Sequence, residues 1–337
     1  MKTNQFNSIK ILLLAGLGLF LFLFSAGIGE ISISPIDVGK TLIGQGDSLN
    51  ELILYQFRLP RVVMAFMVGV ALAFSATILQ SLLRNPLASP DYIGITGGAS
   101  VVAVSIITFF SDYANDLQVP MGLVPVGAFV GASIVGILMY LFSWKKGGIT
   151  PFRFILVGIG FYTLCQALVN LIILLGPVFR SVQAKTWLTG SIYGTSWPYI
   201  QTLLPWLLVL IPITFLMARR LQLHELGEEV AIGLGSRVQR ERLWLLLLST
   251  GLAGAAVSFV GGIGFVGLIA PHMARKIVGN SMVALLLTAG LLGGVLVMGA
   301  DLLGRLVLSP REIPAGVFTA LLGAPYFLYL LVKAKKR

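Results

Sequence analysis

The chain has 337 residues, of which 57% are hydrophobic and only 11% are charged, and its mean hydropathy is +0.93. A soluble domain must cover its surface with polar groups and is about one quarter charged. The composition therefore excludes a soluble globular enzyme and a disordered chain, and it predicts a polytopic membrane protein. The net charge of +11 does not indicate nucleic-acid binding, because the basic residues lie between long apolar runs.

Ten apolar segments approach or exceed the length of about 20 residues that a membrane-spanning helix needs. The predicted fold class is an all-α polytopic membrane protein with ten transmembrane helices, at 10–29, 61–83, 92–111, 121–143, 154–176, 199–218, 243–261, 263–278, 281–304 and 313–332. Only Gly261 and Gly262 separate the short eighth segment from the seventh, so nine crossings are the alternative. The first segment also resembles a signal peptide, but its length and the segments that follow favour an uncleaved span.

The distribution of Lys and Arg predicts the orientation, because these residues are enriched in cytoplasmic loops. With ten spans, both termini lie on one side together with 17 of the 24 basic residues, and this side is predicted to be cytoplasmic. The other side holds seven, namely Lys40, Arg58, Arg61, Arg180, Lys185, Arg305 and Arg311. The loop Ser111–Pro120 carries Asp112 and Asp116 without a basic residue, as an external loop should.

Acidic residues are absent from the predicted spans except near an interface, where Glu30 and Asp301 lie. Carriers driven by protons usually place ionisable residues at mid-membrane. We therefore expect the energy for transport to come from outside this chain. A Na⁺ site built from backbone carbonyls would escape this test.

Sequence motifs for nucleotide or metal binding are incomplete in this chain. Gly39-Lys40-Thr41 resembles the end of a phosphate-binding loop, but Ser34 stands where that loop needs its first glycine. Gly262–Gly267 fits GxGxxG without a preceding strand or a following acidic residue. His224 and His272 are too few for a transition-metal site. We expect no catalytic residue, no metal and no cofactor bound by this chain.

The longest predicted cytoplasmic loop spans 219–242, within a single transmembrane domain of residues 1–337. Leu226, Val230, Ala231 and Leu234 recur at the spacing of one face of a short helix, and Gly235 is placed to end it. An apolar face on a cytoplasmic helix has two explanations. It lies on the membrane or packs beneath its own bundle, or it docks into a groove on a partner protein.

The same loop resembles a known family. Leu226-Gly227-Glu228-Glu229, with Ala231 and Leu234-Gly235, is similar to the coupling-loop signature of the FecCD-type ABC importer permeases, which take up ferric siderophores, haem and vitamin B12. Four more segments agree in family order, and the resemblance runs from about residue 10 to the C-terminus. They are Arg58-Leu59-Pro60-Arg61; Gln80 to Ala88 with Pro90 and Gly94; Phe265-Val266-Gly267-Leu268 with Pro271-His272 and Arg275; and Ala300-Asp301 with Arg305, Glu312-Ile313-Pro314 with Gly316, and Gly323-Ala324-Pro325.

The resemblance implies a type II ABC importer permease that pairs with a second permease subunit, two cytoplasmic ATPases and an external substrate-binding protein. It places ATPase coupling at Glu225, Leu226, Gly227, Glu228, Ala231, Leu234 and Gly235. It places binding-protein docking at Arg58 and Arg61, which we expect at a helix start, and at Arg305. Local pairing is the alternative for these arginines, since Asp301 lies one helical turn from Arg305 and Glu51 is near Arg58.

A third group of matched residues contains helix breakers. Proline ends or kinks a helix and restricts the residue before it. One interpretation of these residues is that they form gates in the transport pathway. The other is that they only make a turn after the second span and a kink in the eighth. The group comprises Asn85, Pro86, Pro90, Pro271, His272, Arg275, Pro314 and Pro325.

The sequence thus predicts a multi-pass permease subunit of the cytoplasmic membrane that translocates an iron chelate, such as a ferric siderophore, and is not itself an enzyme. ATP hydrolysis is expected on a separate subunit. Haem or cobalamin as cargo is the nearest alternative, and an ion-coupled secondary carrier is a further one. A membrane-embedded enzyme would need clustered acid, His or Ser groups at one depth, and the sequence offers none.

Overall fold

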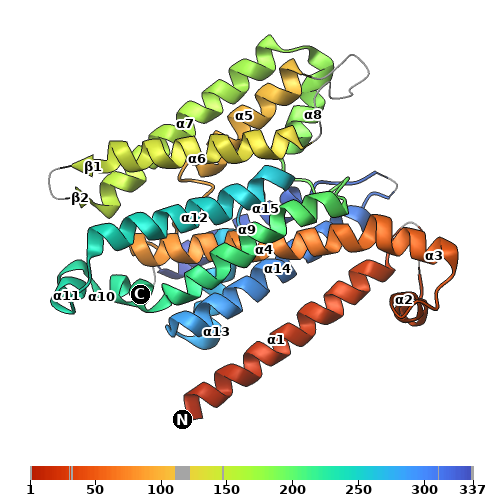
Figure 1. The fold of residues 1–337 in the computed structure, drawn as a ribbon, viewed down its shortest axis with the longest axis horizontal. Helices are drawn as coiled ribbons and strands as arrows, with labels where there is room; N and C mark the ends of the chain where they lie inside the picture. The colour runs from red at the N-terminus through yellow and green to blue at the C-terminus, as the bar shows by residue number, and fades with distance from the viewer. Residues whose placement is uncertain are drawn as a thin grey trace.

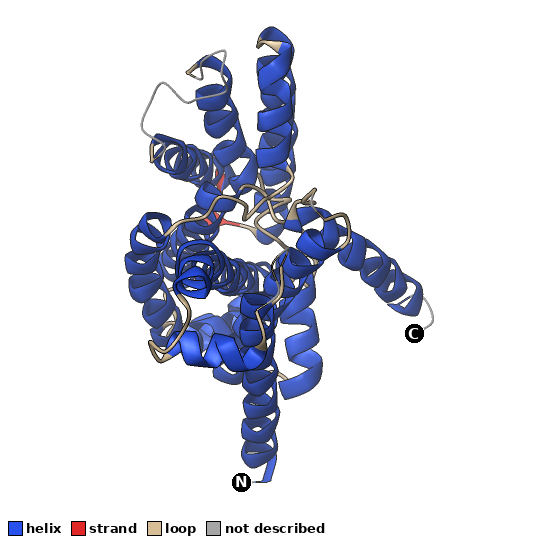
Figure 2. Cartoon of the chain, turned by 90° about the vertical axis from the view of Figure 1, so that its right-hand side faces the viewer, coloured by secondary structure: helices blue, strands red, loops and turns tan. Residues whose placement is uncertain are grey.

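The structure is a computed structural model that describes residues 2–29, 31, 33–110, 122–145, 148–309 and 311–334. Glu30, the loop 111–120 with Asp112 and Asp116, Lys146 and the tail 335–337 lie outside the described residues. Helices make up nearly all of the regular structure that is described (Figure 2). The longer helices are α1 (Lys2–Gly27), α4 (Leu59–Leu83), α5 (Ile95–Phe109), α6 (Leu123–Ser143), α7 (Pro151–Leu175), α9 (Trp197–Leu216), α12 (Val238–Val260), α13 (Val266–Val278), α14 (Met282–Leu306) and α15 (Ala315–Ala334).

Shorter elements connect these helices. They are α2 (Pro35–Leu42), α3 (Ser48–Leu52), the π-helix η1 (Ile53–Arg58), α8 (Val178–Leu188), α10 (Ala218–Leu226) and α11 (Glu228–Gly233). The strands β1 (Trp144–Lys145) and β2 (Gly148–Ile149) form a small antiparallel hairpin.

Each of the ten predicted segments overlaps one of the longer helices over most of its length. In the described part of the chain, 7 helical segments are long and apolar enough to cross a membrane. α5 and α13 are shorter, with 15 and 13 residues, and α15 contributes a short apolar stretch, Ala315–Tyr329. The all-helical, multi-pass architecture is confirmed, whereas the count of ten crossings stays a prediction.

The helices pack in layers around α4, which contacts α12, α13 and α14 (Figure 1). An added Cβ on Gly69 of α4 or on Gly293 of α14 would lie 2.2 Å from the carbonyl oxygen of the other glycine. The two backbones therefore touch, the close approach that small residues permit between helices in membranes. Gly98 of α5 and Gly131 of α6 meet in the same way, and α5 to α8 form the upper layer in Figure 1.

One helix begins earlier than expected. α4 itself starts at Leu59, between Arg58 and Arg61, but the chain is already helical from Ser48, through α3 and η1. The π-helical stretch keeps the helix running, because the Leu59 N–H donates to the Leu54 carbonyl, five residues back. The π-helical stretch could not be predicted, because residues 53–58 combine polar and apolar side chains without a helix breaker.

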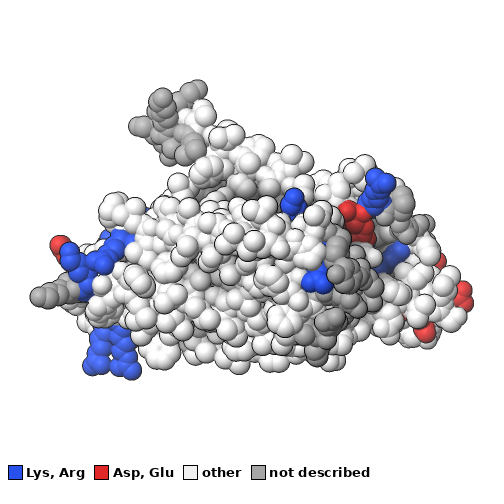
Figure 3. Space-filling model, turned by 90° about the horizontal axis from the view of Figure 1, so that it is seen from above, with Lys and Arg blue, Asp and Glu red and all other residues white. Residues whose placement is uncertain are grey.

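Charged side chains gather toward two ends of the face seen in Figure 3, with an uncharged belt between them. We call one end the terminal pole: it holds the start of α1, the hairpin, α10 and α11, and the end of α13, where Lys10 Nζ donates to the Ile277 carbonyl at 2.7 Å. The opposite pole holds the end of α1, α2, α3, the start of α4 and the end of α14. This separation of charge fits a helical bundle whose middle lies in hydrocarbon.

Candidate functional site

The coupling segment, residues 218–235 at the terminal pole, contains two helices and not one. α10 ends at Leu226 and α11 begins at Glu228, because Gly227 between them has φ +119° and ψ 154°. Only glycine readily adopts this conformation. The expected single short helix that carries Leu226, Val230 and Leu234 is therefore wrong, although Gly235, with φ +82°, lies just past the end of α11 as the sequence predicted.

The apolar side chains of this segment are largely uncovered. Leu226, Val230 and Leu234 are 59%, 48% and 62% exposed, whereas Ala231 is fully buried. Ile232 is exposed as well, although the sequence pattern did not place it on the apolar face. These four exposed side chains do not pack beneath the bundle of their own chain.

Glu225, in the last turn of α10, ties the coupling segment to two long helices. Its Oε1 accepts a hydrogen bond from Ser81 Oγ of α4 at 2.8 Å and forms an ion pair with Arg275 Nη2 of α13 at 3.4 Å. Arg275 Nη1 in turn donates to Gln80 Oε1 of α4 at 2.5 Å. A continuous polar chain thus runs from α10 through α13 to α4.

Gln80 also donates to the backbone carbonyl that Pro271 leaves without a helical partner. Proline lacks an N–H, so the carbonyl of Gly267, four residues earlier in α13, loses its helical partner. Gln80 Nε2 donates to this carbonyl at 3.0 Å, and the Gln80 side chain is buried. α13 continues through Pro271, and the hydrogen bond that the proline removes is replaced from α4, as is common in membrane proteins. The kink expected there stays a prediction.

A second set of contacts joins α11 to α12 and the hairpin. Arg242 of α12 is buried, donates to the Ile149 carbonyl, and pairs with Glu228 Oε2 of α11 at 3.3 Å. Glu241 accepts hydrogen bonds from Arg220 at 2.7 Å and from Ser236. Burial lowers the pKa of the adjacent His224, the charge of Arg242 lowers it further, and Glu241 opposes the shift.

The predicted helix breakers lie at several places in the bundle, and Pro314 follows Glu312 by two residues, away from the coupling segment. Asn85 Oδ1 accepts from the Leu87 N–H at 2.9 Å, which forms a tight turn over Pro86 after α4. Pro90 lies against Gly267, where an added Cβ would be 3.5 Å from the proline ring. Pro325 falls inside α15, Pro314 immediately precedes it, and the ring of His272 packs edge-on against Tyr326 at 5.9 Å between centroids.

The three predicted docking arginines come together at the opposite pole. Arg61 forms ion pairs with Asp301 and Glu312, both at 2.9 Å, and Arg305 Nε lies 3.3 Å from Asp301. Arg58 is buried and donates to the carbonyls of Ala26, Gly27 and Ile31 at the end of α1. We call these three arginines with Asp301 and Glu312 the arginine cluster.

This geometry contains part of the expected local pairing. The Asp301–Arg305 pair is present, but in the described part of the chain no ion pair joins Arg58 to Glu51. The cluster also lines a cavity of about 500 Å³ with Tyr193, Gly194 and Thr195 from the α8–α9 loop. Asp301 is buried and does not line it, so three arginines and the single carboxylate of Glu312 face that cavity.

Sequence reasoning did not single out Gln80, Glu241 or Arg242 as contributors. A buried glutamine inside an apolar helix was the available signal for Gln80, since it needs partners for both ends of its amide. Glu241 and Arg242 looked like ordinary loop charges until the fold placed α11 beside α12. Among the described residues, no three His, Cys, Asp or Glu side chains gather as a metal site.

Comparison with known proteins identifies relatives over nearly the whole chain. Residues 17–333 match the FecCD transport family. The chain is 48% identical to the Bacillus subtilis strain 168 protein named "Probable siderophore transport system permease protein YfhA", over 97% of this chain and 95% of that protein. It is 41% identical to the iron(3+)-hydroxamate import system permease protein FhuG of the same strain, over 93% of each.

The fold is shared as well. A chain from a structure of an inward-facing metal-chelate type ABC transporter superposes with a TM-score of 0.84 at 30% identity, covering 96% of this chain and 98% of that one. The family match and this superposition agree over nearly the whole chain. The chain therefore belongs to the FecCD transport family.

Proposed function

We propose that this chain is the membrane-spanning permease subunit of an ATP-binding cassette importer that carries a ferric siderophore across the cytoplasmic membrane. It would pair with a second permease subunit, two cytoplasmic ATPases and an external substrate-binding protein. The names of its relatives, which include siderophore, hydroxamate and ferric citrate permeases, support this cargo class. Haem and cobalamin remain the alternative cargoes within the same architecture.

The observation that carries the proposal is the uncovered apolar surface of the coupling segment. Leu226, Val230 and Leu234 project from a pole where Lys and Arg predominate. That charge bias supports a cytoplasmic terminal pole and cytoplasmic termini. A short helix that exposes apolar side chains there is suited to insertion into a groove on a soluble partner, which we take to be the ATPase.

Motion of the ATPases would reach the membrane through contacts already described. Glu225 is held by Ser81 and Arg275, so a displacement of α10 pulls on α4 and α13 together. Glu228 and Arg242 connect α11 to α12 in the same way. Residues 219–242 thus act as a coupling loop within one transmembrane domain, and the chain itself performs no covalent chemistry.

The experiment is uptake of a ferric siderophore into vesicles that contain the reconstituted importer, with ATP inside. Uptake should require ATP, the ATPase and the binding protein. The Leu234→Asp variant should lose about tenfold or more in ATPase affinity, since burying an unpaired carboxylate costs several kcal/mol. Glu229→Gln, an exposed change in α11, the helix that Leu234 directly follows, is the control. Uptake that persists without the ATPase would contradict the proposal.

The arginine cluster is our proposed docking site for the binding protein. The net positive charge at the 500 Å³ cavity supports contact with acidic side chains. Charge at an interface rim governs association rate and register more than affinity. The Arg61→Gln variant should therefore bind the external protein more slowly, with a weaker dependence on salt. Association kinetics that equal those of the wild type at low salt would contradict this assignment.

A further inference from the structure

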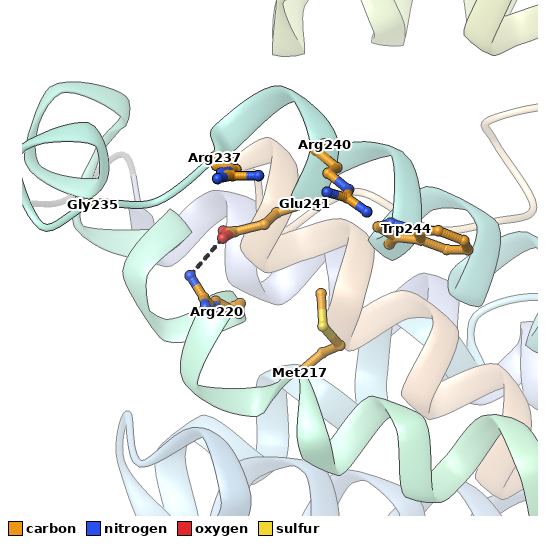
Figure 4. Close-up of a pocket in the computed structure, with 7 residues that line it drawn as sticks. All are labelled: Met217, Arg220, Gly235, Arg237, Arg240, Glu241 and Trp244. Atoms are coloured by element: carbon orange, nitrogen blue, oxygen red, sulfur yellow. Dashed lines mark hydrogen bonds and ion pairs between the residues drawn. The ribbon is translucent and has the colours of Figure 1, made fainter.

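A basic hollow lies at the terminal pole between the end of α9 and the start of α12 (Figure 4). Its volume is about 400 Å³, and Met217, Arg220, Arg237, Arg240, Glu241 and Trp244 line it, with Gly235 at its edge. Three cations face one carboxylate. The hollow is distinct from the exposed apolar side chains of the coupling segment.

Two of the three arginines are available to a ligand. Arg220 is engaged with Glu241 at 2.7 Å, the one interaction drawn among the residues of Figure 4. Arg237 and Arg240 are exposed, and within the described part of the chain neither has an ion-pair partner. Both stand at the first turn of the 23-residue helix α12, where the free backbone N–H groups add positive potential.

The other wall of the hollow lies beside the ends of two apolar helices. Trp244 is 52% exposed and Met217 directly follows α9, whose last residue, Leu216, is 80% exposed. The predicted apolar span begins at residue 243, immediately after the arginines. Tryptophan is enriched at the level of lipid headgroups, and exposed leucines below that level face hydrocarbon.

We propose that this hollow binds the phosphate group of an anionic phospholipid, with Arg237 and Arg240 as the donors. The acyl chains would lie along the exposed apolar surfaces of α9 and α12, beside Trp244. A soluble acidic partner fits the arginines equally well but leaves the apolar wall unused, and therefore we favour a lipid. Basic pockets between membrane-spanning helices recognise headgroups by this combination of charge and depth.

The test is native mass spectrometry of the full chain in detergent, titrated with phosphatidylglycerol or with zwitterionic phosphatidylcholine. Phosphatidylglycerol should bind preferentially and raise the thermal midpoint of the wild type. Each basic residue near an anionic headgroup contributes about a fivefold gain in affinity. The double variant Arg237→Gln/Arg240→Gln should therefore lose roughly 25-fold.

Two controls separate binding from folding. Lys145→Gln/Arg153→Gln removes two charges from the same pole outside the hollow and should retain the lipid. Arg237→Lys/Arg240→Lys should retain most of the affinity, since phosphate accepts from lysine as well. Equal binding of the two lipids, or equal binding by wild type and the glutamine variant, overturns the proposal.

Inorganic phosphate distinguishes a lipid from a small anion. If 10 mM phosphate, on the order of ordinary buffer strength, protects the chain as well as the lipid does, the site is a small-anion site and the proposal is wrong. If lipid binding is unchanged in the glutamine variant while ATPase association is lost, the hollow is a protein interface. These outcomes do not depend on whether the importer carries a siderophore.

Discussion

The two poles of the molecule use charge in opposite ways. At the opposite pole, Arg61 and Arg305 converge on Asp301, which is only 2% exposed, and Arg58 binds backbone carbonyls of α1. At the terminal pole, Glu225 and Glu228 are partly exposed and hold two short helices whose apolar side chains remain uncovered. The first arrangement fixes α1, α4 and α14 together. The second connects the short helices α10 and α11 to the bundle.

The difference separates charges that hold the bundle together from charges that link the bundle to short exposed helices. Charges that this chain satisfies internally contribute mainly to its folding, and their removal leaves buried, unpaired partners. Charges that link short exposed helices to the bundle contribute little to folding. They determine how a displacement of those helices is transmitted to the long helices. Each pole can therefore be tested with a change that affects one property and spares the other.

The largest effect is expected at the opposite pole. Asp301→Ala leaves two arginines without their shared carboxylate, which should cost about 3–5 kcal/mol and lower the thermal midpoint in detergent by about 10 °C. Glu312→Ala is the control, since Glu312 is 31% exposed and its removal should cost less than about 1 kcal/mol. Equal losses of stability in the two variants would mean that burial does not determine how much each carboxylate of this cluster contributes.

At the terminal pole, Arg275→Gln should damage transport more than stability. Its loss breaks the contacts to Glu225 and Gln80, and one charge-assisted hydrogen bond of about 1.5–3 kcal/mol corresponds to tenfold or more in a conformational equilibrium. We expect cargo moved per ATP to fall about tenfold, while the thermal midpoint shifts by only a few degrees.

Two matched variants sharpen this result. Lys276→Gln removes a charge one residue along α13, where Lys276 lies over the Tyr326 ring, and should leave the transport ratio unchanged. Arg275→Lys keeps the charge but not the two-ended guanidinium, so it should rescue only part of the ratio. A wild-type ratio in Arg275→Gln would rule out the polar chain as a transmission path.

The sequence predicted the membrane class and the positions of the main helices because apolar runs and glycine or proline breaks are local signals. Pro271 was placed inside its helix for the same reason, and it lies within α13. The hydrogen bond that replaces the one lost at Pro271 was not predictable, because its partners, Gln80 and Gly267, are 187 positions apart. Long-range partners of this kind follow from the packing of α4 against α13.

The candidate sites divide in the same way. Residue types and family order pointed to Glu225, Gly227 and the three arginines. The break at Gly227 was missed because the spacing of Leu226, Val230 and Leu234 also fits a continuous helix. The burial of the arginines was missed because a charge near a span end usually faces water, and only the fold brings Arg61 to Asp301.

Gly227 offers a smaller effect at the terminal pole. Gly227→Ala should destabilise the chain by about 1–3 kcal/mol, because φ +119° with ψ 154° is strained for any other residue. The cause is conformational and not steric, since the nearest atom to an added Cβ, Arg84 Nη1, is 3.6 Å away. Gly233→Ala, with open space and no positive φ, should be neutral or slightly stabilising in the same thermal assay.

The smallest expected effect is a pH dependence confined to the terminal pole. Burial lowers the pKa of His224 below its ordinary value of 6.5, and the charge of Arg242 lowers it further. The unfolded chain then binds a proton more readily than the folded chain. Stability from this group is therefore complete above about pH 6.5 and falls as the pH decreases, by at most about 1.4 kcal/mol per pH unit. The thermal midpoint of His224→Gln should therefore depend less on pH, between pH 7.5 and about 5.5, than that of the wild type. An unchanged slope of midpoint against pH would show that other groups govern acid sensitivity at this pole.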